Sequence, residues 1–192
     1  IGMPLFFGSG FGGDIFVVMY LMVIHSVMVV LGGSSTGNVY SSLGAGREIK
    51  LVLADELIFI MVVLIPVVAS GYDLQLTALI SAQNSGAFIG SVHGVIGFIA
   101  GLLCIQAKMT MQPFDIPEAE TEIVEGPLME YSGPLLGFWK LNHFMMYVVY
   151  PFLLILLYLG GFNLQGWGIL WAVLKYLLIV VLMIILKNTN PR

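Results

Sequence analysis

The run LVLADELIFIMVVLIPVVAS, residues 51–70, decides the fold. Apart from two acidic residues it is apolar over the length of about 20 residues that a helix needs to cross a bilayer. The chain of 192 residues is 59% hydrophobic and 9% charged, whereas soluble domains carry roughly 25% charged residues. The sequence therefore predicts an all-α, polytopic membrane protein, with residues 1–192 forming a single membrane domain. Four further runs complete a set of about five transmembrane helices: Asp14–Leu31, Phe88–Ala107, Phe138–Gly160 and Trp167–Leu186.

The positive charges predict how these spans are oriented. The spans would place residues 33–50, residues 108–137 and the tail after Leu186 on one side of the membrane. The segments on the other side hold no Lys or Arg. By the positive-inside rule the first side faces the cytoplasm, which predicts a multi-pass plasma-membrane protein with cytoplasmic loops at about 33–50 and 108–137. The cations that decide this are Arg47, Lys50, Lys108, Lys187 and Arg192, with Lys140 at the edge.

Composition also excludes several classes of site. The single cysteine, Cys104, lies inside an apolar run and rules out a disulfide framework. Three scattered histidines form no pattern that predicts a metal site. The formal net charge of −4 sits mostly in one loop, and we expect no nucleic-acid partner.

That loop contains the acidic segment PFDIPEAETEIVEGPLMEYSG, residues 113–133. Its prolines exclude one long helix, although a short helix between Pro117 and Pro127 would place three of its glutamates on one face. Such a cluster can store protons, bind cations or face a redox centre on a partner, whereas the plain alternative is a solvated loop or one docked on a basic patch. Apolar residues threaded through it favour packing against another subunit. Six carboxylates stand in the segment without any Lys or Arg: Asp115, Glu118, Glu120, Glu122, Glu125 and Glu130.

Of the ionisable residues inside the predicted spans, four are candidates for an ion pathway. Asp55 and Glu56 follow Lys50 by five and six residues, which places them about 8–9 Å into the second span. His25 lies in the first span and Lys175 in the last. A charge at the centre of a membrane helix costs at least about 2.5–3.5 kcal/mol, so we expect these residues to form a proton or ion pathway with the acidic segment. Asp55 turning to the head groups, Lys175 snorkelling or pairing, and His25 packing between helices remain open alternatives.

At the acidic segment the sequence resembles a known family. Residues 113–120 read Pro-Phe-Asp-Ile-Pro-Glu-Ala-Glu and are followed by Glu122 and by Glu130-Tyr131. A second stretch holds Gly33, Tyr40, Gly44, Ala45 and Arg47, with Glu56 nine residues later. Both stretches resemble the complex I membrane subunit that adjoins the peripheral redox arm, in the NADH dehydrogenase subunit 1 or H family. Relatives of that subunit occur in membrane-bound nickel-iron hydrogenases.

The resemblance implies an eight-helix family fold of which this chain holds the third to the seventh helix, so we expect a longer parent polypeptide. It also implies that the two cytoplasmic loops hold a peripheral redox module. Residues expected at that interface are Arg47, Tyr40, Phe114 and Tyr131.

Details of the motif distinguish the branches of the family. Glu125-Gly126-Pro127 and the Glu-Tyr-Ser-Gly of residues 130–133 look like the hydrogenase branch, and Asn142 stands where quinone-reducing members tend to carry a glutamate.

The resemblance then implies a subunit of an energy-converting hydrogenase that couples electron transfer from ferredoxin, and proton reduction, to proton or ion translocation. The chain itself would hold no cofactor and would not be catalytic alone. Nickel-iron and iron–sulfur centres are expected in peripheral large and small hydrogenase subunits, and antiporter-like subunits are expected in the membrane. The alternatives are the equivalent subunit of complex I or of a sulfur-reducing complex, and a purely structural anchor.

Overall fold

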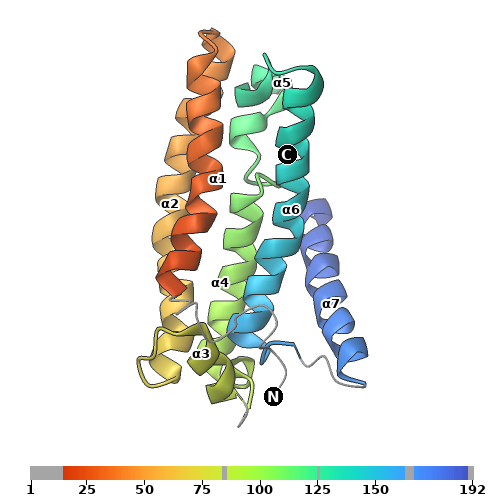
Figure 1. Cartoon of the computed structure of the whole chain (residues 1–192). Helices are drawn as coiled ribbons and strands as arrows, with labels where there is room; N and C mark the ends of the chain where they lie inside the picture. The colour runs from red at the N-terminus through yellow and green to blue at the C-terminus, as the bar shows by residue number, and fades with distance from the viewer. Residues whose placement is uncertain (1–14, 84–85, 125, 163–166, 190–192) are drawn as a thin grey trace.

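The chain folds as a bundle of α-helices, in a computed structural model that describes residues 15–83, 86–124, 126–162 and 167–189. Its long helices run side by side along one axis (Figure 1), and the described residues hold five of them. The prediction of an all-α polytopic membrane protein is confirmed. Four of these helices are long and apolar enough to cross a membrane. The fifth, α4, has 17 residues and a length of about 26 Å, at the lower end of the spanning range. The five are α1 (Ile15–Ser35), α2 (Val39–Ala69), α4 (Val92–Lys108), α6 (Gly133–Tyr158) and α7 (Gly168–Thr189).

The predicted loop at 33–50 is wrong in its structure, because most of it is helical. α1 continues through Ser35, and α2 begins at Val39 after a tight turn in which Gly37 has a φ of +72°. The side chain of Asn38 caps α2 by accepting a hydrogen bond from the backbone N–H of Tyr40 (2.9 Å). Turn-forming residues suggested a long loop, but one N-cap is enough to start a helix that extends well beyond the apolar run.

The other predicted loop, at 108–137, is a chain of short helical turns before α6 begins at Gly133. The short helix expected between Pro117 and Pro127 exists only as the four residues of α5, and Glu118 belongs to the preceding 3-10 turn. These turns lie at the same end of the bundle as the α1–α2 connection, and α3 lies at the opposite end (Figure 1). Short elements are α3 (Leu76–Ala82), η2 (Phe88–Gly90), η3 (Ile116–Glu118), α5 (Glu120–Ile123) and η4 (Gly126–Leu128).

Prolines inside two long helices free backbone carbonyls, and tyrosines of neighbouring helices bind them. Pro66 in α2 cannot donate to the carbonyl of Val62, and the hydroxyl of Tyr158 donates to that oxygen instead (2.6 Å). Pro151 in α6 frees the carbonyl of Tyr147 in the same way, and Tyr176 of α7 donates to it at 3.3 Å. Backbone groups without partners are costly in a bilayer, so these hydroxyls stabilise the bundle.

Small residues let α4 lie close against its neighbours. A Cβ on Gly97 would come within 2.3 Å of the Tyr158 hydroxyl oxygen, and one on Gly101 within 2.6 Å of Leu154 Cδ1. Close approach of helices through glycine is typical of membrane bundles. α4 therefore packs between α2 and α6, which places its last residue, Lys108, against the middle of α2.

The outer surface of the bundle is apolar. Large side chains such as Leu53, Leu57 and Met61 of α2 are 64–68% exposed, and Trp171 of α7 is 64% exposed. A soluble protein rarely exposes so continuous an apolar surface. The exposed side chains are suited to contact with lipid or with further membrane helices.

Candidate functional site

A buried ion-pair cluster joins α2 and α4 near the acidic segment. The ammonium nitrogen of Lys108 lies 3.0 Å from Oδ2 of Asp55 and 2.7 Å from Oε2 of Glu56. The side chains of Lys108 and Asp55 are each only 6% exposed. Lys108 also lies 4.6 Å from the ring centroid of Phe59, which adds a cation–π contact. The two acidic residues singled out from the sequence are therefore brought together, and the cation that joins them is one that we had assigned to the cytoplasmic surface.

Glu48 extends this cluster, and sequence reasoning missed it. It had been placed in the predicted loop, but it lies on α2 two turns before Asp55 and is only 5% exposed. Ser26 of α1 lies beside its carboxylate. Glu48, Ser26, Asp55 and Lys108 line a common cavity of about 10 Å³, at the lower limit for holding one water molecule. The available signal in the sequence was the spacing of Glu48 and Asp55, which are two helical turns apart. It could be used only if α2 was known to begin before Glu48.

The acidic segment is seated on the α1–α2 hairpin through Pro127. A Cβ on Gly44 would lie 2.7 Å from Pro127 Cδ, and one on Gly33 would lie 2.9 Å from Pro127 Cβ. The fully buried Ser41 donates its hydroxyl hydrogen to either of two carbonyl oxygens, that of Gly33 (2.9 Å) or that of Pro127 (3.0 Å). Gly33, Ser41 and Gly44 thus form a shallow seat that we call the Pro127 seat. Both of its glycines belong to the second stretch that carried the family resemblance.

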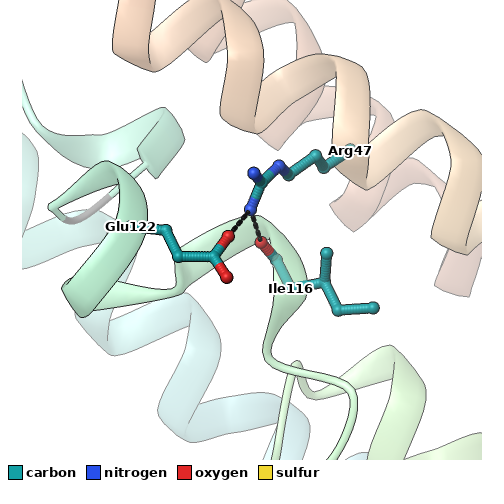
Figure 2. Close-up of polar contacts among 3 residues, drawn as sticks. All are labelled: Arg47, Ile116 and Glu122. Atoms are coloured by element: carbon teal, nitrogen blue, oxygen red, sulfur yellow. Dashed lines mark hydrogen bonds and ion pairs between the residues drawn. The ribbon is translucent and has the colours of Figure 1, made fainter.

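Polar contacts fasten the same segment at three further points. Arg47 donates through Nη1 to Oε2 of Glu122 (2.5 Å) and to the carbonyl oxygen of Ile116 (3.3 Å), as Figure 2 shows. Thr110 donates to the carboxylate of Glu118 (3.3 Å). Asn38, at the α1–α2 turn, donates to the carboxylate of Glu130. The acidic segment is therefore fixed to the helices beneath it and is not a freely solvated loop.

The remaining carboxylates of the segment are less informative. Asp115 is half-buried and has an interaction of its own. Glu120 lies in α5. Glu125 lies outside the described residues. Their part in an ion pathway stays a prediction.

Three of the residues expected at a partner interface lie around this segment. Tyr40 is 50% exposed near the start of α2, and Phe114 is half-buried before η3. Tyr131 packs edge-on against Trp139, with 5.8 Å between ring centroids. Arg47 holds the acidic segment through its bonds to Glu122 and Ile116, a contact that we call the Arg47 clamp, although its side chain keeps 27% exposure.

A larger cavity of about 330 Å³ opens between α1 and α6 beneath the acidic segment. His25 lines it, and the side-chain amide of Asn142 donates to Nδ1 of His25 (2.7 Å). The cavity combines titratable groups with aromatic and aliphatic walls, the composition of a small-molecule site. Its lining residues are His25, Val29, Glu118, Leu128, Leu136, Trp139, Lys140, His143, Phe144 and Tyr147.

Lys175 lies away from these groups. Its ammonium donates to the carbonyl oxygens of Leu159 (2.5 Å) and Gly161 (3.3 Å), at the end of α6 remote from the acidic segment. A cation at a helix C-terminus satisfies carbonyls that lack partners and complements the helix dipole. The geometry favours the alternative in which Lys175 pairs within the bundle, and its part in an ion pathway stays a prediction.

Comparisons with known proteins agree with the family resemblance. The family model described as NADH dehydrogenase matches residues 3–192. The NADH-quinone oxidoreductase subunits H of Bacillus mycoides (strain KBAB4) and Bacillus cereus (strain AH187) are each 34% identical over 174 residues, which are 88% of this chain and 51% of each relative. The chain thus spans about half the length of these curated relatives. A solved chain of the membrane-bound sulfane sulfur reductase, an archaeal respiratory membrane complex, has a TM-score of 0.83 at 25% identity, covering 94% of this chain and 61% of that one.

Proposed function

Since this chain belongs to the NADH dehydrogenase family, we propose that it is the membrane subunit of an energy-converting hydrogenase. In this role it anchors a peripheral redox module and couples electron transfer from ferredoxin, and proton reduction, to ion movement across the membrane. The observation that carries the coupling part is the ion-pair cluster of Lys108 with Asp55 and Glu56. One cation there faces two carboxylates, the buried Asp55 and the half-buried Glu56, a balance that a proton or another cation can adjust.

The position of Lys108 gives the coupling a physical route. Lys108 is the last residue of α4, and the chain then runs directly into the acidic segment. Two residues later Thr110 is bonded to Glu118. A charge change in a redox module over the segment would pull on its carboxylates, and the short connection transmits that pull to the Lys108 ammonium. Withdrawal of the ammonium leaves Asp55 and Glu56 without their cation and favours proton uptake there.

The peripheral hydrogenase subunits and the antiporter-like membrane subunits are proposed partners. Nickel-iron and iron–sulfur centres belong to the peripheral subunits in this proposal, and this chain supplies anchoring and proton-binding groups. The acidic segment, which the Pro127 seat and Arg47 hold in place, lies at one end of the bundle (Figure 1), and the proposed module docks at that end. Location in the plasma membrane with the acidic segment on the cytoplasmic face is part of the proposal, supported by the bias of Lys and Arg.

Assignment to the hydrogenase branch rests on Glu125-Gly126-Pro127 and on Asn142. Pro127 packs on the seat, so the Glu-Gly-Pro motif also has a packing role. Any branch of the family that shares the seat would need the same proline. Asn142 is a neutral amide bonded to His25 in the larger cavity, where quinone-reducing members tend to carry an acidic group.

A second candidate is the equivalent subunit of a quinone-reducing or sulfur-reducing complex. The cavity of about 330 Å³ has room for a ring compound, which favours a quinone. The likeness to the sulfane sulfur reductase complex favours sulfur chemistry. A purely structural anchor would need neither the cavity nor several buried carboxylates around one lysine.

The experiment that tests the branch uses the intact complex, purified through this chain. Reduced ferredoxin or reduced viologen is supplied, and hydrogen evolution is measured beside reduction of a quinone and of sulfane sulfur. Hydrogen evolution with no quinone or sulfur reduction supports the hydrogenase. Reduction of either competing acceptor without hydrogen refutes the branch and leaves the coupling cluster to be tested separately.

A further inference from the structure

A groove runs along the outer face of α2 at the end of the bundle that carries the acidic segment. Two cavities of about 390 Å³ each open there, and both are lined by Arg47 and Lys50. Because they share these two cations, the cavities adjoin and form one recess, which we call the Arg47–Lys50 groove. One part reaches up to Ser42 and Gly46, and the other reaches down to Ala54 and across to Ile116.

Small residues form the floor of the groove. Ser42 and Gly46 are four residues apart and lie on one face of α2, and Ala54 lines the second cavity farther along the helix. A Cβ built on Gly46 would meet no atom within 4 Å. In contrast to the Pro127 seat, where glycine is needed for close packing, this glycine leaves open space.

Both cations have donors available for an anion. Lys50 is exposed and has no ion-pair partner among the described residues. Arg47 uses the single nitrogen Nη1 for both Glu122 and Ile116 (Figure 2). A guanidinium carries five N–H donors, so the remaining nitrogens can bind a second anion. Arg47 and Lys50 line the same two cavities, so that anion can bind between them while Glu122 stays on Nη1.

The groove also lies at a boundary between polar and apolar surface. The acidic segment lies beside it and contributes Ile116 to its lining, and the apolar run of α2 begins at Leu51 in the same lining. Leu53 and Leu57, farther along that run, are 66% and 68% exposed. A ligand held at Lys50 would therefore have a polar end among cations and could extend an apolar tail along the outer surface of α2.

From this arrangement we propose that the Arg47–Lys50 groove binds one anionic phospholipid. Its phosphate lies between Arg47 and Lys50, and an acyl chain runs over Leu51 and Ala54 toward Leu57. Basic pockets beside membrane helices bind anionic head groups in this way. An acidic segment of a partner protein would also suit the cations, but it would not use an apolar path that continues into the membrane-facing surface. The inference goes beyond the proposed function and does not depend on it.

The test is lipid binding to the intact complex, purified through this chain and stripped of lipid in detergent. Phosphatidylglycerol and phosphatidylcholine with identical acyl chains are added, and bound lipid is counted by native mass spectrometry. We expect phosphatidylglycerol to bind in preference. Lys50→Gln should weaken that binding about fivefold, the effect of one basic side chain near an anionic head group. Lys187→Gln, which removes a cation from the last turn of α7, is the matched control and should leave binding unchanged.

A second variant keeps the test independent of charge. Gly46→Leu fills the open floor and favours the helix, so the chain should fold while the groove is blocked and the lipid is lost. Equal binding of the two lipids by the wild type, or retention of phosphatidylglycerol by both variants, would overturn the proposal. Variants that retain the lipid but lose peripheral subunits would assign the groove to a protein partner instead. Displacement of the lipid by inorganic phosphate at the same concentration would overturn the role given to the acyl chain.

Discussion

Replacing Gly44 by alanine should unseat the acidic segment. The new Cβ would lie 2.7 Å from Pro127 Cδ, 2.9 Å from Pro127 N and 3.0 Å from the carbonyl carbon of Gly126. Two of these are backbone atoms, which cannot rotate away. Overpacking of this kind costs about 1–3 kcal/mol, whereas alanine gains about 0.8–1.0 kcal/mol over glycine in a helix. We expect the overpacking to dominate, with a net loss of up to about 2 kcal/mol.

Gly46→Ala is the matched control for this prediction. It makes the same change two residues along the same helix, where a Cβ meets nothing within 4 Å. We expect it to stabilise the protein by up to about 1 kcal/mol. The free energy of unfolding would be measured for both variants by denaturant titration in one detergent, followed by helical circular dichroism. Equal effects of the two substitutions, or a stabilising Gly44→Ala, would refute the close packing of Pro127 on α2.

Three further predictions concern single contacts. Lys108→Met should destabilise the chain by about 3–5 kcal/mol, because it removes the cation that pairs with the buried Asp55. Adding Asp55→Asn should restore part of the lost stability. No recovery in the double variant would argue against the ion pair of Lys108 with Asp55. Tyr158→Phe should lower the free energy of unfolding by about 0.5–1.5 kcal/mol, because the carbonyl of Val62 loses its hydrogen-bond donor. Tyr176→Phe should cost less, because its hydrogen bond to the carbonyl of Tyr147 is longer. The reverse order in thermal unfolding would be inconsistent with the geometry. Arg47→Gln should change unfolding by at most about 1 kcal/mol, since its ion pair is partly exposed, but it should speed proteolysis of the acidic segment; unchanged cleavage would contradict its role as a clamp.

The helical bundle could be predicted from the sequence because apolar length alone selects membrane helices. Asp14–Leu31 and Leu51–Ser70 correspond to α1 and to the larger part of α2. Helix ends were harder to predict from the sequence. The first part of α2, residues 39–50, lies outside the apolar run and gave no sign that the helix begins there. That boundary error hid Glu48, which appeared to be a loop residue and is instead buried beside Asp55.

The candidate site was predicted in part. Asp55 and Glu56 were recognisable because carboxylates inside an apolar run are expensive. Their partner was not, since Lys108 was counted among the cations that face the cytoplasm. The side chain of Lys108 is turned inward by the packing of α4 against α2, which the sequence does not show. The Pro127 seat was likewise hidden, because a glycine read from sequence does not reveal which backbone lies over it.

The proposed coupling requires that Lys108 link the acidic segment to ion movement. The decisive measurement is the ratio of ions moved to electrons transferred by the intact complex in sealed proteoliposomes, for the wild type, Lys108→Gln and the control Lys187→Gln. We expect Lys108→Gln, whose side-chain amide unlike that of the Met variant can still donate hydrogen bonds to Asp55 and Glu56, to assemble and transfer electrons while its ion movement falls at least tenfold, and Lys187→Gln to match the wild type. An unchanged ratio in an assembled Lys108→Gln complex would contradict the coupling role and leave the cluster as a structural contact between α2 and α4.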